Sequence, residues 1–74
     1  MALHRLESLV TGTVWKVERQ VGDQVAAGDT VLILESMKME IPIEAPASGV
    51  LREMRVIEGE SVDEGQLLAL LFQG

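Results

Sequence analysis

An internal repeat with an offset of 37 residues is the feature that most constrains this 74-residue chain. TGTVWKVERQVGDQVAAGDTVLIL, residues 11–34, aligns with SGVLREMRVIEGESVDEGQLLALL, residues 48–71. The residues that keep register are Gly12 with Gly49, Gly22 with Gly59, Gly28 with Gly65, Val25 with Val62, and Leu34 with Leu71. One half alone would expose its apolar strands, so the two halves must pack on each other. We therefore expect a single domain over residues 1–74, with repeat halves at about 11–36 and 48–73.

Each half has the pattern of strands and turns. Glycines divide it into an opening strand, a short extended piece around Val25 or Val62, and a closing apolar strand. No stretch between the glycines keeps an apolar period of 3.6 residues, which argues against helices. The positions expected to adopt positive φ are Gly22, Gly28, Gly59 and Gly65. The pattern predicts an all-β flattened barrel or sandwich with a pseudo-twofold axis.

The closing strands TVLIL and QLLALL are apolar on both faces, which is typical of strands in the middle of a sheet. Symmetry places the hairpin of residues 35–40 at one end of the axis and both chain termini at the other. After this hairpin, alternation puts Ile41 and Ile43 on one face and Glu40, Pro42 and Glu44 on the other. Pro42 cannot donate a ladder hydrogen bond, so its nitrogen should face solvent or an irregular part of the sheet.

The tip of this hairpin, ESMKME, has an unusual composition. Tight hairpin turns favour Asn-Gly, Asp-Gly or Gly-x because they need positive φ, yet this tip contains none of these residues. Methionine does not stabilise a solvent-facing turn, but Met37 and Met39 would give a partner's pocket a soft apolar grip beside Lys38. This interpretation makes Lys38 the residue that a partner enzyme handles.

Composition excludes several function classes. Without cysteine the chain has no disulfide and no Cys-based metal site, which fits a reducing compartment and leads us to expect a cytoplasmic protein. His4 is the only histidine and is expected to be solvated on a frayed N-terminus, so no zinc site or Cys–His pair is possible. The formal charge of −6 argues against nucleic acid and anionic lipid. The longest apolar run, residues 67–72, is too short to cross a membrane.

The other candidate residues have structural interpretations. Trp15 is expected to pack within an opening strand. The turn carboxylates Glu58, Glu60, Asp63 and Glu64 are expected to form a solvated rim. No phosphate-binding glycine loop is present, because none of the glycines opens a helix. We therefore predict no catalytic residue, no metal ligand and no enzymatic activity for the chain by itself.

The segment from Glu35 to Met39 resembles the biotin-attachment motif of biotinyl carrier domains, in which a small residue, Met, Lys and Met follow one another. The Gly-Asp pairs at residues 22–23 and 28–29 and APASG at residues 45–49 also resemble this biotin/lipoyl attachment family. The resemblance covers about residues 8–72. The chain departs from the family at residues 8–12, SLVTG, where an Ala-Pro entry is usual. It also has no thumb-like insertion between Gly12 and Gly28.

The resemblance implies a barrel-sandwich hybrid of two four-stranded antiparallel sheets and a carrier function. A biotin protein ligase would join biotin to Lys38, guided by Met37 and Met39 within the flanking motif of Glu35, Ser36 and Glu40. The carrier would then move carboxyl groups from a biotin carboxylase to a carboxyltransferase. Two alternatives stay open: a lipoyl carrier of a 2-oxoacid dehydrogenase-type system, with lipoate as the cofactor, and an unmodified β-module. The lipoyl motif usually reads Asp-Lys-Ala, whereas Lys38 has methionine on both sides.

Overall fold

The computed structural model describes residues 1–74 and contains eight strands and no helix. The strands are β1 (Ala2–Glu7), β2 (Gly12–Val17), β3 (Gln24–Val25), β4 (Thr30–Ser36), β5 (Met39–Glu44), β6 (Gly49–Met54), β7 (Ser61–Val62) and β8 (Leu67–Gln73). They form two four-stranded sheets, in the orders β1-β8-β6-β3 and β5-β4-β2-β7, with antiparallel pairing throughout. The all-β, two-sheet fold predicted from the repeat is confirmed.

The sequence repeat is also a repeat of strands. Adding 37 residues converts β1, β2, β3 and β4 into β5, β6, β7 and β8. The halves are interlocked because strands pair across them: β2 pairs with β7 through Gly12 and Val62, and β3 pairs with β6 through Gln24 and Val50. Neither half therefore completes a sheet on its own.

The core lies between the two sheets and is supplied mainly by their interior strands. β4 lies between β5 and β2, and β8 lies between β1 and β6, as their apolar sequences predicted. Leu34 and Leu71, a pair in the repeat, are both fully buried. The remaining buried apolar residues are Leu6, Val14, Val25, Val31, Leu32, Ile43, Ala45, Leu51, Val56, Val62, Leu68 and Ala69. This packed layer gives the tips at either end a rigid base.

Four glycine turns repeat one local structure, in which the glycine is the third of four residues. The glycines have φ between 85° and 99°, which suits the third position of a type II turn. The fourth residue donates its backbone N–H to the carbonyl of the first, and its side-chain oxygen accepts the N–H of the first. The four residues that do this are Asp23, Asp29, Glu60 and Gln66. The sequence suggested that the turn carboxylates form only a solvated rim. This expectation is wrong for Glu58, which accepts the Val17 N–H at 2.9 Å, and for Glu60, which caps its own turn.

The expectation of a frayed N-terminus is wrong. Residues 2–7 form β1, which pairs with β8 from Ala2 opposite Gln73 to Glu7 opposite Leu67. The His4 Nε2 atom lies 2.8 Å from Oε1 of Gln73. β1 is ordered because it takes the place beside β8 that β5 takes beside β4.

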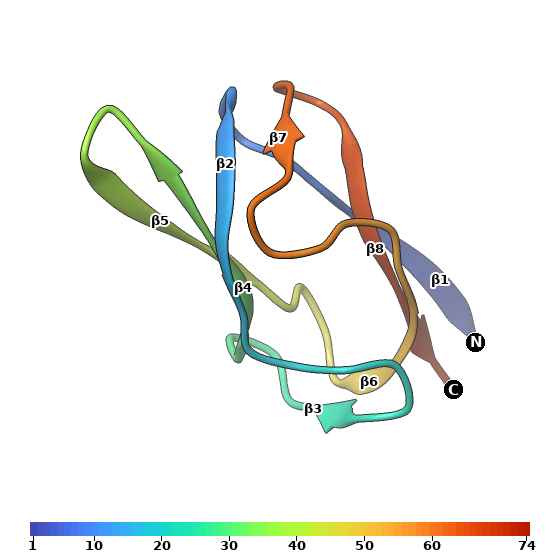
Figure 1. The fold of residues 1–74 in the computed structure, drawn as a ribbon. Helices are drawn as coiled ribbons and strands as arrows, with labels where there is room; N and C mark the ends of the chain where they lie inside the picture. The colour runs from blue at the N-terminus through green and yellow to red at the C-terminus, as the bar shows by residue number, and fades with distance from the viewer.

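The molecule is elongated, with extents of 36 × 17 × 17 Å. Figure 1 shows the β4–β5 hairpin at one end and the two chain termini at the other, as the repeat predicted. Residues 37 and 38 form the turn of the hairpin, and the termini at residues 74 and 1 occupy the equivalent place in the repeat. The hairpin is therefore held away from the rest of the chain.

Candidate functional site

The candidate site is the tip of the β4–β5 hairpin. The last strand pair is Ser36 opposite Met39, so Met37 and Lys38 alone form the turn. Their φ angles are 52° and 65°, and they are the only non-glycine residues with positive φ. Positive φ at both central residues is the requirement of a type I′ turn, which normally selects Asn-Gly or a similar pair.

This backbone conformation is strained. A side chain in the left-handed region costs roughly 1–2 kcal/mol per residue. The chain uses glycine in all four of its other positive-φ turns, so its absence here is not a general feature of the fold. Local strain of this kind persists at functional sites, where the side chains are needed for another purpose.

The side chains at the tip are open to solvent. Met37 is 92% exposed and Met39 is 65% exposed. Lys38 is exposed and takes part in no ion pair, although three of the chain's arginines do. An unpaired primary amine on a projecting turn is suited to amide-bond formation. No ion pair of Lys38 has to break before the amine enters an enzyme's active site.

The base of the hairpin is fixed to β2 and the residues before it. The Ser36 hydroxyl donates to the Thr11 carbonyl at 2.9 Å. Gly12 lies directly against the backbone of Glu35, and a Cβ atom there would collide with the Glu35 carbonyl oxygen. Gly49 meets the Phe72 carbonyl in the same way in the other half. The two aligned glycines therefore permit close approach of backbones, and the tip stands on a rigid support.

Two carboxylates lie opposite each other below the turn. Glu35 on β4 pairs with Glu40 on β5, both are exposed, and neither takes part in an ion pair. Like charges directly opposite each other destabilise a strand pair. The hairpin thus presents a negative rim beside the free Lys38 ammonium.

The six residues singled out from the sequence lie within this one hairpin. They are Glu35, Ser36, Met37, Lys38, Met39 and Glu40. Lys16, the only other lysine, lies within β2 and not on a turn.

Trp15 differs from its sequence-based interpretation. Its side chain is 48% exposed, although its neighbour Val14 is almost completely buried. It is the extra residue of a β-bulge, because the β2–β4 register shifts between Val14 and Lys16. Because Val14 points into the core, ordinary alternation already turns Trp15 outward. The bulge brings the next residue, Lys16, to the exposed side as well, and sequence patterning gave no signal of this bulge.

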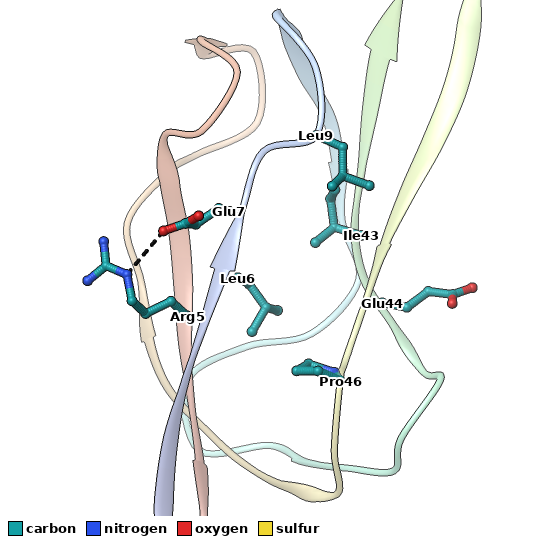
Figure 2. Close-up of a pocket in the computed structure, with 7 residues that line it drawn as sticks. All are labelled: Arg5, Leu6, Glu7, Leu9, Ile43, Glu44 and Pro46. Atoms are coloured by element: carbon teal, nitrogen blue, oxygen red, sulfur yellow. Dashed lines mark hydrogen bonds and ion pairs between the residues drawn. The ribbon is translucent and has the colours of Figure 1, made fainter.

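A shallow groove of about 300 Å³ lies between the edge strands β1 and β5 (Figure 2). Its lining residues are Arg5, Leu6, Glu7, Leu9, Ile43, Glu44 and Pro46. Six of the seven form three pairs of the repeat, in which Leu6 matches Ile43, Glu7 matches Glu44 and Leu9 matches Pro46. The groove therefore follows from the meeting of two sheet edges at the pseudo-twofold axis, and Lys38 does not line it.

The structure contains no cluster of three or more acidic or histidine side chains placed to hold a metal ion. It also contains no helix with the length and hydrophobicity needed to cross a membrane.

Comparison with known proteins identifies similar chains. The family model for biotin/lipoyl domains, described as "Biotin-requiring enzyme", matches residues 6–71. The chain is 51% identical over 59 residues to the biotin/lipoyl attachment protein of Bacillus subtilis, with 80% of this chain and 81% of that protein covered. It is 37% identical over 62 residues to the biotinylated protein TB7.3 homolog of Mycobacterium leprae, covering 84% of this chain and 87% of that protein.

Larger proteins contain similar segments. The chain is 35% identical over 68 residues to the dihydrolipoyllysine-residue succinyltransferase component of 2-oxoglutarate dehydrogenase complex of Staphylococcus saprophyticus. That match covers 92% of this chain but only 16% of the relative. Among solved structures, the Kluyveromyces lactis urea carboxylase matches with a TM-score of 0.91 and 38% identity. This match covers 97% of this chain and 6% of the urea carboxylase.

Proposed function

Because the chain belongs to the family of biotin- and lipoyl-attachment domains, we propose that it is a biotin carboxyl carrier with biotin on Lys38. The observation that carries the proposal is the free Lys38 amine on a strained, exposed turn between two methionines. The bound biotin would supply a ring nitrogen that accepts and releases a carboxyl group. The domain's own residues present the arm and perform no chemistry on it.

Attachment requires a neutral Lys38 amine that is held in line with an activated acyl group. The Lys38 ammonium must lose a proton, so that its lone pair attacks the activated acyl carbon and the activating group departs. A biotin protein ligase would supply both the activated acyl group and the environment in which the exposed Lys38 ammonium loses its proton. Met37 and Met39 would fill apolar sites of the ligase and hold the amine in line.

Once loaded, the domain would work by presentation. A flexible arm on a rigid base keeps its end group at high effective concentration near two active sites. We propose that these belong to a biotin carboxylase and a carboxyltransferase in the cytoplasm. The proposal is supported by the similarity of the chain to a urea carboxylase over 97% of its length.

A lipoyl carrier is the second candidate, because a dihydrolipoyllysine-residue succinyltransferase component is also similar. Biotin is favoured because methionine flanks Lys38 on both sides, whereas the lipoyl motif usually reads Asp-Lys-Ala. The flanking residues are what a modifying enzyme meets first, since they are the most exposed apolar side chains of the tip.

The test is mass spectrometry of the intact chain produced beside a biotin protein ligase or beside a lipoate ligase. We expect one biotinyl adduct, and peptide mapping should place it on Lys38 and not on Lys16. A lipoyl group as the main adduct would favour the second candidate. A chain modified by neither enzyme would reject both and favour an unmodified module.

A further inference from the structure

An apolar patch crosses three strands on the outer face of the sheet β5-β4-β2-β7. It consists of Trp15, Ile33 and Pro42, and we call it the outer patch. Ile33 lies opposite Lys16 on one side and Pro42 on the other, and Trp15 bulges out immediately before Lys16. Neighbouring residues in these strands point into the core, so the outer patch faces solvent.

The pseudo-twofold repeat provides an internal comparison for Trp15. The equivalent bulge in β6 holds Arg52, since the β6–β8 register shifts between Leu51 and Glu53. The Arg52 guanidinium lies 4.4 Å from the centre of the half-buried Phe72 ring, so the second half of the repeat covers its aromatic residue with a side chain. Trp15 has no such cover, because the residue equivalent to Phe72 is Glu35. The bulge therefore does not require an exposed tryptophan.

The outer patch adjoins the attachment hairpin. Glu35 and Glu40 lie two residues nearer the tip than Ile33 and Pro42, and on the same face of the sheet. A strand advances about 3.3 Å per residue, so the patch begins within roughly 15 Å of the turn. Trp15, Met37 and Met39 are all among the exposed large apolar residues of the chain. Met37, in the turn itself, places an exposed apolar side chain beside Lys38, with the two unpaired carboxylates between it and the outer patch. Met39 lies on the opposite face of β5 from Pro42.

We propose that the outer patch is the docking surface on which the ligase rests while Lys38 enters its active site. The inference builds on the proposed function and extends the contact beyond the hairpin. An exposed tryptophan in an apolar patch with a charged rim is the composition of an interface centre. The unpaired Glu35 and Glu40 specify a partner surface with basic residues around an apolar area. A second copy of this chain is disfavoured, because it would bring two acidic rims together on molecules that each carry a charge of −6.

The test compares Trp15→Thr with Arg52→Thr, which places the same residue at the equivalent bulge of the other half. The wild-type chain and both variants are titrated with ligase, biotin and ATP. We expect Trp15→Thr to raise the KM for the carrier about tenfold with kcat nearly unchanged, as for removal of one interface anchor. Arg52→Thr should leave KM at the wild-type value.

A binding readout that is independent of activity uses the single tryptophan. Carrier labelled with 5-fluorotryptophan gives one 19F signal, which should shift or broaden when ligase is added and should not change with albumin. Pro42→Thr, with a melting curve, serves as a second patch variant if Trp15→Thr fails to fold, and it too should raise KM.

The outcomes separate the two proposals. Normal biotinylation of Trp15→Thr and Pro42→Thr, with an unchanged 19F signal, would overturn the docking surface and leave the carrier function intact. A fall in kcat at constant KM would also overturn it, because Trp15 would then position the hairpin. A wild-type chain that accepts no biotin would reject the carrier function and the docking surface with it.

Discussion

Met37 and Lys38 hold a turn conformation that asparagine or glycine would adopt with less strain. Both residues adopt positive φ, so the chain forms a two-residue turn without asparagine or glycine. Both side chains are exposed, which suggests that they are kept for contact with a partner. The side chains that would stabilise the turn are not the ones that an enzyme could grip. At this scale the tip exchanges stability for recognition.

The strain at Met37 leads to a prediction about stability. Met37→Asn should raise the free energy of unfolding by about 1 kcal/mol, because asparagine tolerates the left-handed region better than methionine does. Urea denaturation measures the change, and Met39→Asn is the control because Met39 lies in a strand. The same Met37 variant should be biotinylated more slowly. A lower stability for Met37→Asn would show that the methionine side chain, and not the turn backbone, holds the tip together.

Lys38 separates fold from function. Lys38→Arg keeps a long, charged and exposed side chain, so we expect a stability change within about 0.5 kcal/mol. A guanidinium group does not lose its proton, so the variant should accept no acyl group from the ligase. Melting curves and biotin incorporation are the measurements. Unfolding of Lys38→Arg would make the lysine structural, and residual biotin uptake would place the arm on another residue.

Among the elements, the four glycine turns depend most on the identity of individual residues. Each of the four combines positive φ at glycine with a side-chain oxygen that caps the first residue of the turn. Space is not the constraint, since a Cβ atom at Gly28 or Gly65 would meet no atom within 4 Å. The backbone angle alone selects glycine there.

This distinction predicts how the turns respond to substitution. Gly28→Val or Gly65→Val should lower the free energy of unfolding by more than about 1–2 kcal/mol, because a β-branched residue is poorly suited to positive φ. Gly28→Asn should lose much less, since asparagine enters this region readily. Chemical denaturation of the three variants is the measurement. Equal losses for valine and asparagine would mean that side-chain contact, and not φ, governs these turns.

The whole molecule is two interlocked halves, and this architecture controls how the chain can be divided. A fragment of residues 1–40 contains β1 to β4 but lacks β8, β6 and β7, the partners of β1, β3 and β2. It should remain unfolded, because the apolar strand β4 would be left without the opposing sheet. Circular dichroism and a thermal scan test this expectation. A cooperative transition in the fragment would contradict the interlocked arrangement.

Joining the termini is the complementary experiment at this scale. Gly74 and Met1 stand where Met37 and Lys38 stand in the repeat, and Ala2 already pairs with Gln73. Head-to-tail ligation should therefore close β8 and β1 into a second two-residue hairpin. The melting temperature should rise, because the cyclic unfolded chain has less conformational entropy. Ligation through a ten-residue glycine-serine linker is the control and should stabilise less. A lower melting temperature for the direct joint would show that the two ends of the molecule differ in geometry.

The sequence by itself determined the local features of this protein. Turn glycines, strand alternation, the repeat and the unusual tip are readable because each depends on the backbone preference of one residue or on the period of a short segment. Those signals were sufficient for the fold class, and they are the basis on which Lys38 is predicted as the attachment residue.

Only the tertiary structure decided which strands meet and in what register. β1 is ordered because its partner β8 comes from the other end of the chain, and Lys16 lies opposite Ile33 because the β2–β4 register shifts at Trp15. Glu35 faces Glu40 through the same kind of cross-strand pairing. Strand pairing joins residues that are distant in sequence. The free energy that stabilises a given register comes from the side-chain packing between the two paired strands. No property of either strand alone contains it.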